Sequence, residues 1–298
     1  MAAVRPGQTG RVPELPEVQA LAERMAEASA GRTVARVEVL SVQVLKTFDP
    51  PVSALEGRAV EGVGRYGKFL DLRTTGGPHL VLHLARAGWI RHRAAFSAKP
   101  VRPGRGPLAL RLVLDDGSGF DITEQGTTKR LAAYVVTDPH LVPGIGRLGA
   151  DPLGEGFTPA VLAGLAAGAR QRLKTFLTDQ SVLAGIGNAY SDEILHAARL
   201  SPYAIASALG EEQVAQLYTA VREVLGSAVA QAHDAPADAL KSEKKAALAV
   251  HGRSGEPCPR CGDTVRSVNF ADKSLQYCPT CQTGGRVLAD RRLSRLLK

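Results

Sequence analysis

The sequence predicts an α+β protein of several domains, and three observations carry this prediction. A helical apolar pattern near the start is followed by many short alternating runs, which indicates one helix on the flank of a β-sandwich or barrel. After a Gly- and Pro-rich stretch at 143–156, the apolar pattern becomes helical. All four cysteines then lie between Cys258 and Cys281. A chain of 298 residues is long enough for two domains and a small appended module.

The first predicted element is a helix that opens within Pro13–Val18, the segment PELPEV. Apolar residues recur at helical spacing from Leu15 to Ala26, and Gly31 supplies a stop. Proline is tolerated in a first helical turn, and glutamate there favours the positive end of the helix dipole. Taken alone, the segment needs no other explanation than a helix opening. Residues 1–12 are small and polar without periodicity, so we expect a disordered leader there.

Short runs typical of strands follow this helix. Asp115-Asp116-Gly117 indicates a hairpin between two of the runs, and Thr75-Gly76-Gly77 indicates another turn. The predicted runs are Val34–Val44, Arg58–Tyr66, Lys68–Leu72, His79–Leu84, Leu108–Leu114, Phe120–Thr123 and Ala132–Val136.

The second half of the chain is predicted to be helical. Between two of its helices, Leu183–Tyr190 contains Gly185 and Gly187. These glycines could let backbone N–H groups approach a phosphate at a helix N-terminus, or they could only make a tight turn. The predicted helices are Thr158–Ala167, Arg170–Thr178, Ala189–Ala198 and Glu211–Ala232.

Two Cys-x-x-Cys pairs separated by sixteen residues predict a zinc ribbon near the end of the chain. Four thiolates leave no open coordination position, so the predicted zinc is structural; a redox pair or chance clustering is the alternative. From His251 to Lys298 there are nine Lys and Arg against four Asp and Glu, and Arg253 in this basic module is a candidate DNA contact. The predicted ligands are Cys258, Cys261, Cys278 and Cys281.

The net charge of +8 and the pI near 9.5 favour a polyanionic partner, either nucleic acid or an anionic membrane surface. No apolar run approaches the roughly 18 residues of a membrane span, and no signal peptide appears, so we expect a cytoplasmic protein. Two Gly-x-Gly-x-x-Gly matches, at Gly62 and Gly144, lack the strand before and helix after that a dinucleotide site requires. We therefore expect no nucleotide cofactor.

Four features occur in one order: Pro13–Val18, the Gly67-Lys68 strand start, Gly185–Asn188 and the terminal cysteine pairs. In this combination the sequence resembles the formamidopyrimidine-DNA glycosylase / endonuclease VIII family of base-excision repair enzymes, over nearly all of residues 13–281. The resemblance implies a β-sandwich with a flanking helix, a helix–two-turn–helix domain and a C-terminal zinc finger. It also implies one structural Zn²⁺, damaged double-stranded DNA as the partner of a monomer, and a place on the bacterial nucleoid.

The same resemblance implies a mechanism. Pro13 would be the mature N-terminal residue, whose secondary amine attacks C1′ of the damaged nucleotide, with Glu14 as proton shuttle and Glu17 as a supporting acid. An α-amino group has a pKa of about 7.7–8, so much of it is unprotonated near neutral pH. Loss of the base would leave an iminium that permits strand cleavage by β-elimination. Three further residues match phosphate-binding positions of the family: Lys68 near the lesion, Asn188 after the glycines, and Lys273 where arginine is usual.

The sequence leaves the lesion preference open. The target base must leave the duplex, so side chains should fill the vacated stack. In the oxidised-purine branch a methionine follows His-Leu-Gly, whereas here Arg86 follows His83-Leu84-Ala85. Glu124–Leu131 replaces the second wedge region of that branch. We expect Arg86 to contact DNA and do not transfer 8-oxoguanine specificity, while Trp89 is expected in the core.

As written, Pro13 is internal, and its nitrogen is a tertiary amide without a nucleophilic lone pair. Val12 precedes it, and the GUG codon of valine can serve as a bacterial start, so we expect a mature chain that begins at Pro13. The alternative is a catalytically inactive protein that binds damaged DNA or abasic sites on the same scaffold. The expected divisions are 1–12 as leader, 13–145 as catalytic sandwich, 150–250 as helical DNA-binding domain, 251–281 as zinc finger, and 282–298 as a basic tail that either contacts DNA or is solvated.

Overall fold

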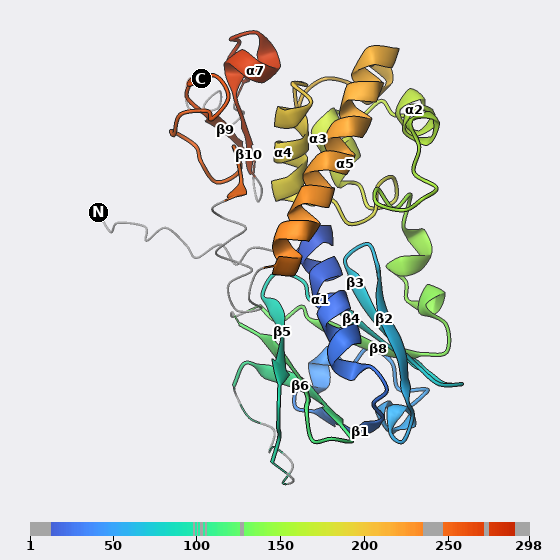
Figure 1. Cartoon of the computed structure of the whole chain (residues 1–298). Coiled ribbons are helices and arrows are strands. Elements are labelled where there is room, and N and C mark those ends of the chain that lie inside the picture. Colours follow the sequence, from blue (N-terminus) through green and yellow to red (C-terminus); the bar gives the residue numbers. More distant parts are fainter. Residues whose placement is uncertain are drawn as a thin grey trace. The chain divides into compact units, whose positions relative to one another are not determined.

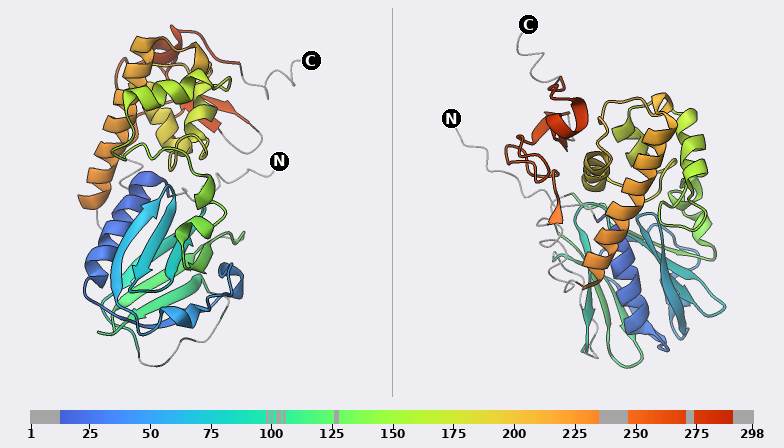
Figure 2. Two further views of the ribbon diagram at one scale, coloured as in Figure 1. Left: turned by 90° about the vertical axis from the view of Figure 1, so that its right-hand side faces the viewer. Right: turned by 45° about the horizontal axis from the view of Figure 1, so that its top comes forward.

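The computed structural model describes residues 13–97, 99, 101, 104, 106–125, 128–234, 247–270 and 274–289 (Figures 1 and 2). They group into two compact units. The first contains Pro13 and Glu17–Gly146, and the second contains Glu14–Pro16 with the described part of Arg147–Lys298. None of the helices in these ranges combines the length and apolar character that a membrane span requires.

The predicted first helix is present as α1 (Leu15–Ser29). Its apolar stripe is buried, as the spacing of the sequence predicts, with Val18, Leu21 and Met25 nearly inaccessible to solvent. The hydroxyl of Ser29 donates to the carbonyl oxygen of Met25 in the last turn. Two residues later Gly31 has a φ of 67°, the left-handed conformation that commonly ends a helix.

The first unit is a sandwich of two four-stranded antiparallel sheets, with strand orders β1-β6-β7-β5 and β2-β3-β4-β8. This confirms the sandwich and excludes the barrel. Both predicted turns are hairpins with a glycine at positive φ, Gly76 between β3 and β4 and Gly117 between β6 and β7. The strands are β1 (Val34–Val39), β2 (Val60–Tyr66), β3 (Phe69–Thr74), β4 (His79–His83), β5 (Gly88–Arg93), β6 (Leu108–Leu114), β7 (Gly119–Glu124) and β8 (Ala132–Val136).

Two segments differ from the sequence prediction. The run Val34–Val44 divides, because the N–H groups of Leu40 and Ser41 both turn to the carbonyl oxygen of Ala109, and Val42–Val44 forms the short 3₁₀ helix η1. The strand β5 was not predicted at all. Its first three residues are buried and its last three exposed, so it lacks the alternation that identifies a strand, and it lies at a sheet edge.

The helical part of the second unit contains α2 (Pro159–Ala167), α3 (Leu173–Thr178), α4 (Asn188–Ala197) and α5 (Glu211–Asp234). The Thr158 hydroxyl accepts a hydrogen bond from the N–H of Val161 and so caps the start of α2. α3 begins later than predicted because Arg172 has an extended backbone. Phe176, Ile194 and Leu217 belong to one apolar core built from α3, α4 and α5.

The zinc module consists of the antiparallel pair β9 (Arg266–Asn269) and β10 (Ser274–Tyr277), followed by α7 (Pro279–Thr283). The chain does not leave this module after the last cysteine. The N–H of Leu288 donates to the Tyr277 hydroxyl at 2.7 Å, and the Tyr203 hydroxyl donates to the carbonyl oxygen of Ala289 at 3.2 Å. The Leu288 side chain packs against the apolar cluster of the β9–β10 hairpin, which consists of Val268, Leu275 and Tyr277, and Tyr203 packs against the same cluster.

The first unit offers a test of its strand geometry, because Trp89 is the only tryptophan and is buried in the sandwich, as expected. Gly119 has a φ of 149°, and a Cβ there would lie 2.1 Å from the carbonyl oxygen of Leu112. Gly119→Ala should therefore lower the free energy of unfolding by about 2 kcal/mol or more, measured by Trp89 fluorescence in urea. Gly64→Ala in β2 meets nothing within 4 Å and is the matched control. Equal midpoints for the two variants would contradict this account of Gly119.

Candidate active site and zinc centre

The carboxylate of Glu14 lies on the N-terminus of α4. Its Oε2 accepts from the N–H of Gly187 at 2.8 Å and of Tyr190 at 3.3 Å, and its Oε1 accepts from the N–H of Ala189 at 2.9 Å. The first N–H groups of a helix have no partner within the helix and carry the positive end of its dipole. They are therefore a natural site for an anion, and here the anion is a buried side chain of the same chain.

The glycines before α4 make this contact sterically possible. A Cβ on Gly187 would lie 2.3 Å from Cδ of Glu14. Gly185 has a φ of 92°, and its Cβ would lie 2.8 Å from that of Leu15, whose N–H donates to the Gly185 carbonyl oxygen. The sequence left open whether this segment binds phosphate or is only a tight turn. In the structure, the N–H groups that were considered for a phosphate hold the Glu14 carboxylate.

Pro13 and Glu17 flank this carboxylate in the sequence. Pro13 directly precedes Glu14 and is buried. Glu17 lies in the first turn of α1 and is only 3% exposed. Acidic residues are common at this position of a helix, but they are seldom buried.

Lys68 lies in a two-residue turn between β2 and β3, not at the start of a strand as predicted. Tyr66 pairs with Phe69 across the hairpin, and Gly67 has the positive φ that such a turn requires. The side chain of Lys68 is half-buried. Burial, with the charge of Lys68 as a second cause, lowers the pKa of His83 on the adjoining strand to about 4.

Arg86 is exposed on the tight turn between β4 and β5. The turn is closed by a hydrogen bond from the N–H of Gly88 to the carbonyl oxygen of Leu84, and Ala85 within it has a φ of 51°. The segment that replaces the second wedge region is held at its base, since the buried carboxylate of Glu124 accepts from the N–H groups of Arg130 and Leu131.

Asn188 is the first residue of α4, and its side-chain amide donates to the carbonyl oxygen of Ser274 in β10 at 2.8 Å. One turn later, Asp192 is almost fully buried. Its carboxylate contacts Nζ of Lys174 at 2.7 Å, Nδ1 of His251 at 2.7 Å, and the N–H of Gln276 at 3.1 Å. These bonds join the helical core to the zinc module at the candidate phosphate contact.

The sequence does not predict that α4 holds the zinc module through buried acids. Glu193, the residue after Asp192, is also buried and accepts from the N–H groups of Ala249, Val250 and His251. Burial raises the pKa of Glu193, and these three N–H bonds oppose that rise. In the sequence, two adjacent acids near a helix start indicate only a favourable dipole interaction. Their spacing in the sequence does not predict that both side chains are buried.

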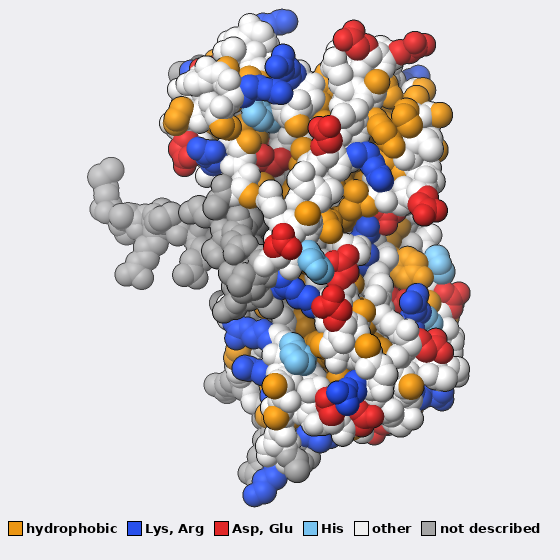
Figure 3. Space-filling model, in the orientation of Figure 1, with side chains coloured by type: hydrophobic (Ala, Val, Ile, Leu, Met, Phe, Trp, Pro, Cys, Tyr) orange, Lys and Arg blue, Asp and Glu red, His pale blue; other side chains and the backbone are white. Residues whose placement is uncertain are grey.

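Two predicted DNA contacts remain, Arg253 and Lys273. The guanidinium of Arg253 is half-buried and engages Glu256, with Nε and Oε2 2.7 Å apart. Lys273 lies outside the described residues. On the face shown in Figure 3, acidic and basic side chains are interspersed. The net charge therefore does not by itself locate a DNA-binding surface on this face.

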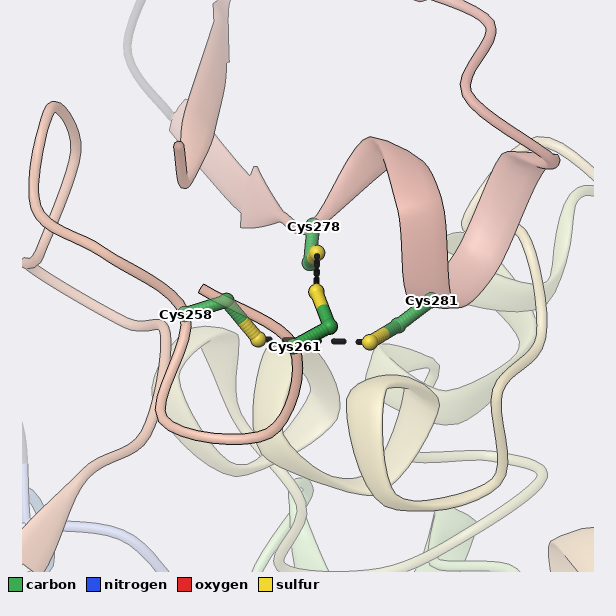
Figure 4. Close-up of side chains that lie close together, drawn as sticks. All are labelled: Cys258, Cys261, Cys278 and Cys281. Atoms are coloured by element: carbon green, nitrogen blue, oxygen red, sulfur yellow. Dashed lines mark hydrogen bonds between the residues drawn. The ribbon is translucent and has the colours of Figure 1, made fainter. Parts of the chain in front are cut away.

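The four cysteines form a compact cluster (Figure 4). All four sulfurs lie within 4.8 Å of one another, with Cys258 and Cys281 separated by 3.9 Å and Cys261 and Cys278 by 3.4 Å. Tetrahedral zinc with bonds of about 2.3 Å places its sulfurs about 3.8 Å apart, so the cluster fits this ion. Burial raises the pKa of Cys281 to about 11 and also raises that of Cys278. A bound cation would supply the charge that thiolates need there.

Three family models match consecutive parts of the chain. The formamidopyrimidine-DNA glycosylase N-terminal domain model matches residues 12–130, the H2TH domain model of the same enzyme matches 148–237, and the model of a zinc finger found in FPG and IleRS matches 255–284. A formamidopyrimidine-DNA glycosylase of Thermus thermophilus is 36% identical over 283 residues, which cover 92% of this chain and 100% of that protein. This chain belongs to the formamidopyrimidine-DNA glycosylase family.

Other members of the family agree in sequence and structure. An uncharacterized formamidopyrimidine-DNA glycosylase-like protein of Mycobacterium tuberculosis is 61% identical over 137 residues, 46% of this chain and 87% of that protein. The crystal structure of the MutM (Fpg) protein from Thermus thermophilus matches with a TM-score of 0.76 and 32% identity, over 91% of this chain and 98% of that one. Lactococcus lactis Fpg, bound to DNA containing N7-benzyl-Fapy-dG, matches with a TM-score of 0.79, 25% identity and coverage of 91% and 100%.

Family membership confirms the predicted architecture of sandwich, helix–two-turn–helix domain and zinc finger. It also identifies the cysteine cluster as the zinc finger of the family, and the ion it binds is structural because all four ligands come from the protein. The division points predicted from the sequence stay predictions, as do the roles of the individual site residues.

His83 predicts a pH dependence for the sandwich. Because its folded-state pKa of about 4 lies below the ordinary 6.5, the unfolded chain takes up a proton first as the pH falls. The stability of the first unit should therefore decrease between about pH 6.5 and pH 4. Urea unfolding followed by Trp89 fluorescence at pH 7.5 and pH 5 should show a smaller difference for His83→Gln than for the wild type. Exposed His92 supplies the control, since His92→Gln should keep the wild-type difference.

Proposed function

We propose that this chain is a base-excision repair enzyme with DNA glycosylase and AP lyase activities. It removes damaged, oxidised bases from duplex DNA through an imine on Pro13 and cleaves the strand by β-elimination. The observation that best supports this proposal is the position of Glu14. Its carboxylate is the side chain next to the nucleophile, and three N–H groups of the helix–two-turn–helix domain hold it in place.

The chemistry follows from these two residues. The free secondary amine of Pro13 forms a bond to C1′ while the bond from C1′ to the base breaks, and the base leaves with a proton. The nitrogen then loses its proton, and the sugar ring opens as the C1′–O4′ bond breaks and O4′ takes up a proton. The product is an iminium between C1′ and the Pro13 nitrogen, which acidifies the hydrogens at C2′. Removal of one of them breaks the C3′–O bond and releases the strand with its phosphate. Water then hydrolyses the imine and frees Pro13.

Glu14 is placed to carry protons between these steps. The N–H groups of Gly187, Ala189 and Tyr190 hold its two oxygens in one orientation beside Pro13 in the chain. A carboxylate with this orientation can accept a proton from the Pro13 amine or the opened sugar and return it. Because its donors are backbone groups, the carboxylate keeps its place while its charge changes.

The other predicted residues bind DNA in this proposal. Lys68 and Asn188 contact phosphates beside the lesion, and the Asn188 amide has a second N–H besides the one given to Ser274. Arg86 occupies the stack that the damaged base vacates. Glu17 supports the start of α1 as an acid. Arg253 and Lys273 add phosphate contacts from the zinc module.

The mechanism requires that Pro13 be the N-terminal residue. The match to the N-terminal domain of the family begins at residue 12, directly before Pro13, which supports a mature start at this proline. A peptide bond to Val12 would remove the nucleophile. A protein that retained it would bind damaged DNA or abasic sites without catalysis, and this is the second candidate function.

Borohydride trapping separates the two candidates. A full-length chain beginning at Pro13 and one beginning at Met1 are each mixed with a duplex that carries one abasic site. Borohydride reduces an imine to a stable protein–DNA adduct, so the first chain should form the adduct and the second should not. Mass spectrometry of the native N-terminus then shows which form the cell makes. Binding without an adduct from the Pro13 form would favour the non-catalytic protein.

A second experiment tests the position of Glu14. In Gly187→Ala the new methyl group displaces the carboxylate, so the single-turnover rate of base release should fall about 100-fold or more. Gly164→Ala on α2 is a matched control, since its Cβ meets nothing within 4 Å and the rate should be unchanged. Zinc content and thermal melting confirm that both variants fold. An unchanged rate in Gly187→Ala would remove the support that this contact gives to the mechanism.

A further inference from the structure

The last turn of α4 and the residues after it form three hydrogen bonds with the zinc finger. Nη1 of Arg260 donates to the carbonyl oxygen of Ala197 at 3.3 Å, and Nε2 of Gln282 donates to that of Leu200 at 3.0 Å. The third bond is different, because it reaches a zinc ligand itself. Nε2 of His196 lies 3.3 Å from Sγ of Cys258.

The apolar surroundings of the Cys258 sulfur favour a hydrogen-bond donor beside it. Cys258 is 2% exposed and packs in an apolar cluster with Val250 and Val265. A thiolate buried in such a place needs hydrogen bonds as well as the metal. Backbone N–H groups of Asp263 and Cys281 bond to the sulfurs of Cys261 and Cys278. For Cys258 the structure supplies an imidazole, from a helix 62 residues earlier in the chain.

The side chain of His196 is buried on the side of α4 that contacts the zinc module. It is 6% exposed, on the same side of α4 as the polar side chains that meet the rest of the zinc module. Asn188, Asp192 and His196 follow one another at intervals of four residues, so they form one stripe along the helix. Each contacts a different part of the zinc module: Ser274, then His251 with Gln276, then the ligand Cys258.

We propose that His196 is a positioning residue of the zinc finger whose Nε2 carries the proton and donates it in a hydrogen bond to the Cys258 thiolate. The bond withdraws electron density from the sulfur and fixes its direction, so it slows the loss of zinc and makes α4 part of the metal site. This role concerns metal retention and does not depend on the proposed glycosylase activity.

Two variants of the full-length zinc protein distinguish the donor from simple packing. His196→Phe keeps a ring but removes the N–H, whereas His196→Gln places an amide N–H near the position of Nε2. Zinc transfer to a colorimetric chelator should be about 10–100-fold faster from the phenylalanine variant. The glutamine variant should recover most of the wild-type rate. Arg260→Gln is the matched control, because Arg260 contacts the same helix without touching a sulfur.

A spectroscopic measurement reports the sulfur directly. In the cobalt-substituted protein, loss of a hydrogen bond raises the energy of the sulfur electrons, so the sulfur-to-cobalt charge-transfer band of His196→Phe should move to longer wavelength. Arg260→Gln should leave the band in place. A packing role predicts no shift of the band, together with wild-type zinc loss from the phenylalanine variant and fast loss from the glutamine variant, because only the former keeps the ring. Either result overturns the proposal.

The position of the proton on the His196 ring can be measured in the wild-type protein, so this test does not depend on the folding of a variant. With ¹¹³Cd in the zinc site, the Nε2 proton of His196 should show a scalar coupling to the metal through the Cys258 sulfur. An imidazole whose proton is on Nδ1 would show none and would contradict the assigned hydrogen bond.

Discussion

One buried carboxylate connects the opening of α1 with the opening of α4. Glu14 lies 173 residues before its first partner, Gly187. The contact between them restricts which residue types are tolerated at the start of α1 and at the start of α4. On one side it requires an acid directly after the proposed nucleophile. On the other it requires a helix whose first N–H groups are unoccupied and whose preceding loop has no side chains in the way. The glycine-rich loop is thus shaped by a part of the chain that folds against it.

α4 makes contacts with other segments of the chain at both of its ends. Its N-terminal N–H groups bind a carboxylate, and its last turn bonds to the zinc finger. Between them Asp192 and Glu193 are buried, although burying acids without partners would be costly. Lysine, histidine and backbone N–H groups compensate both of them. A helix with so much buried polarity depends on its neighbours for stability.

Much of the fold could be predicted from the sequence, because regular spacing is a local property. The stripe that buries Val18 and Met25 identifies α1, and the two cysteine pairs identify the zinc finger. Contacts between distant segments leave no such pattern. An acid such as Asp192 has the same sequence context whether it faces water or a lysine, and the seating of Glu14 on α4 appears only when both segments are in place. The edge strand β5 was missed for a related reason, since half of it is exposed on both faces.

The segment after α7 changes where this protein can be divided. The match to the zinc finger of the family ends at residue 284, but Leu288 packs against the apolar cluster of Val268, Leu275 and Tyr277. A chain cut at the family boundary would expose an apolar face of the β9–β10 hairpin and leave the Tyr277 hydroxyl to water. Residues 285–289 therefore belong to the zinc finger of this protein, and a fragment intended for study in isolation has to include them.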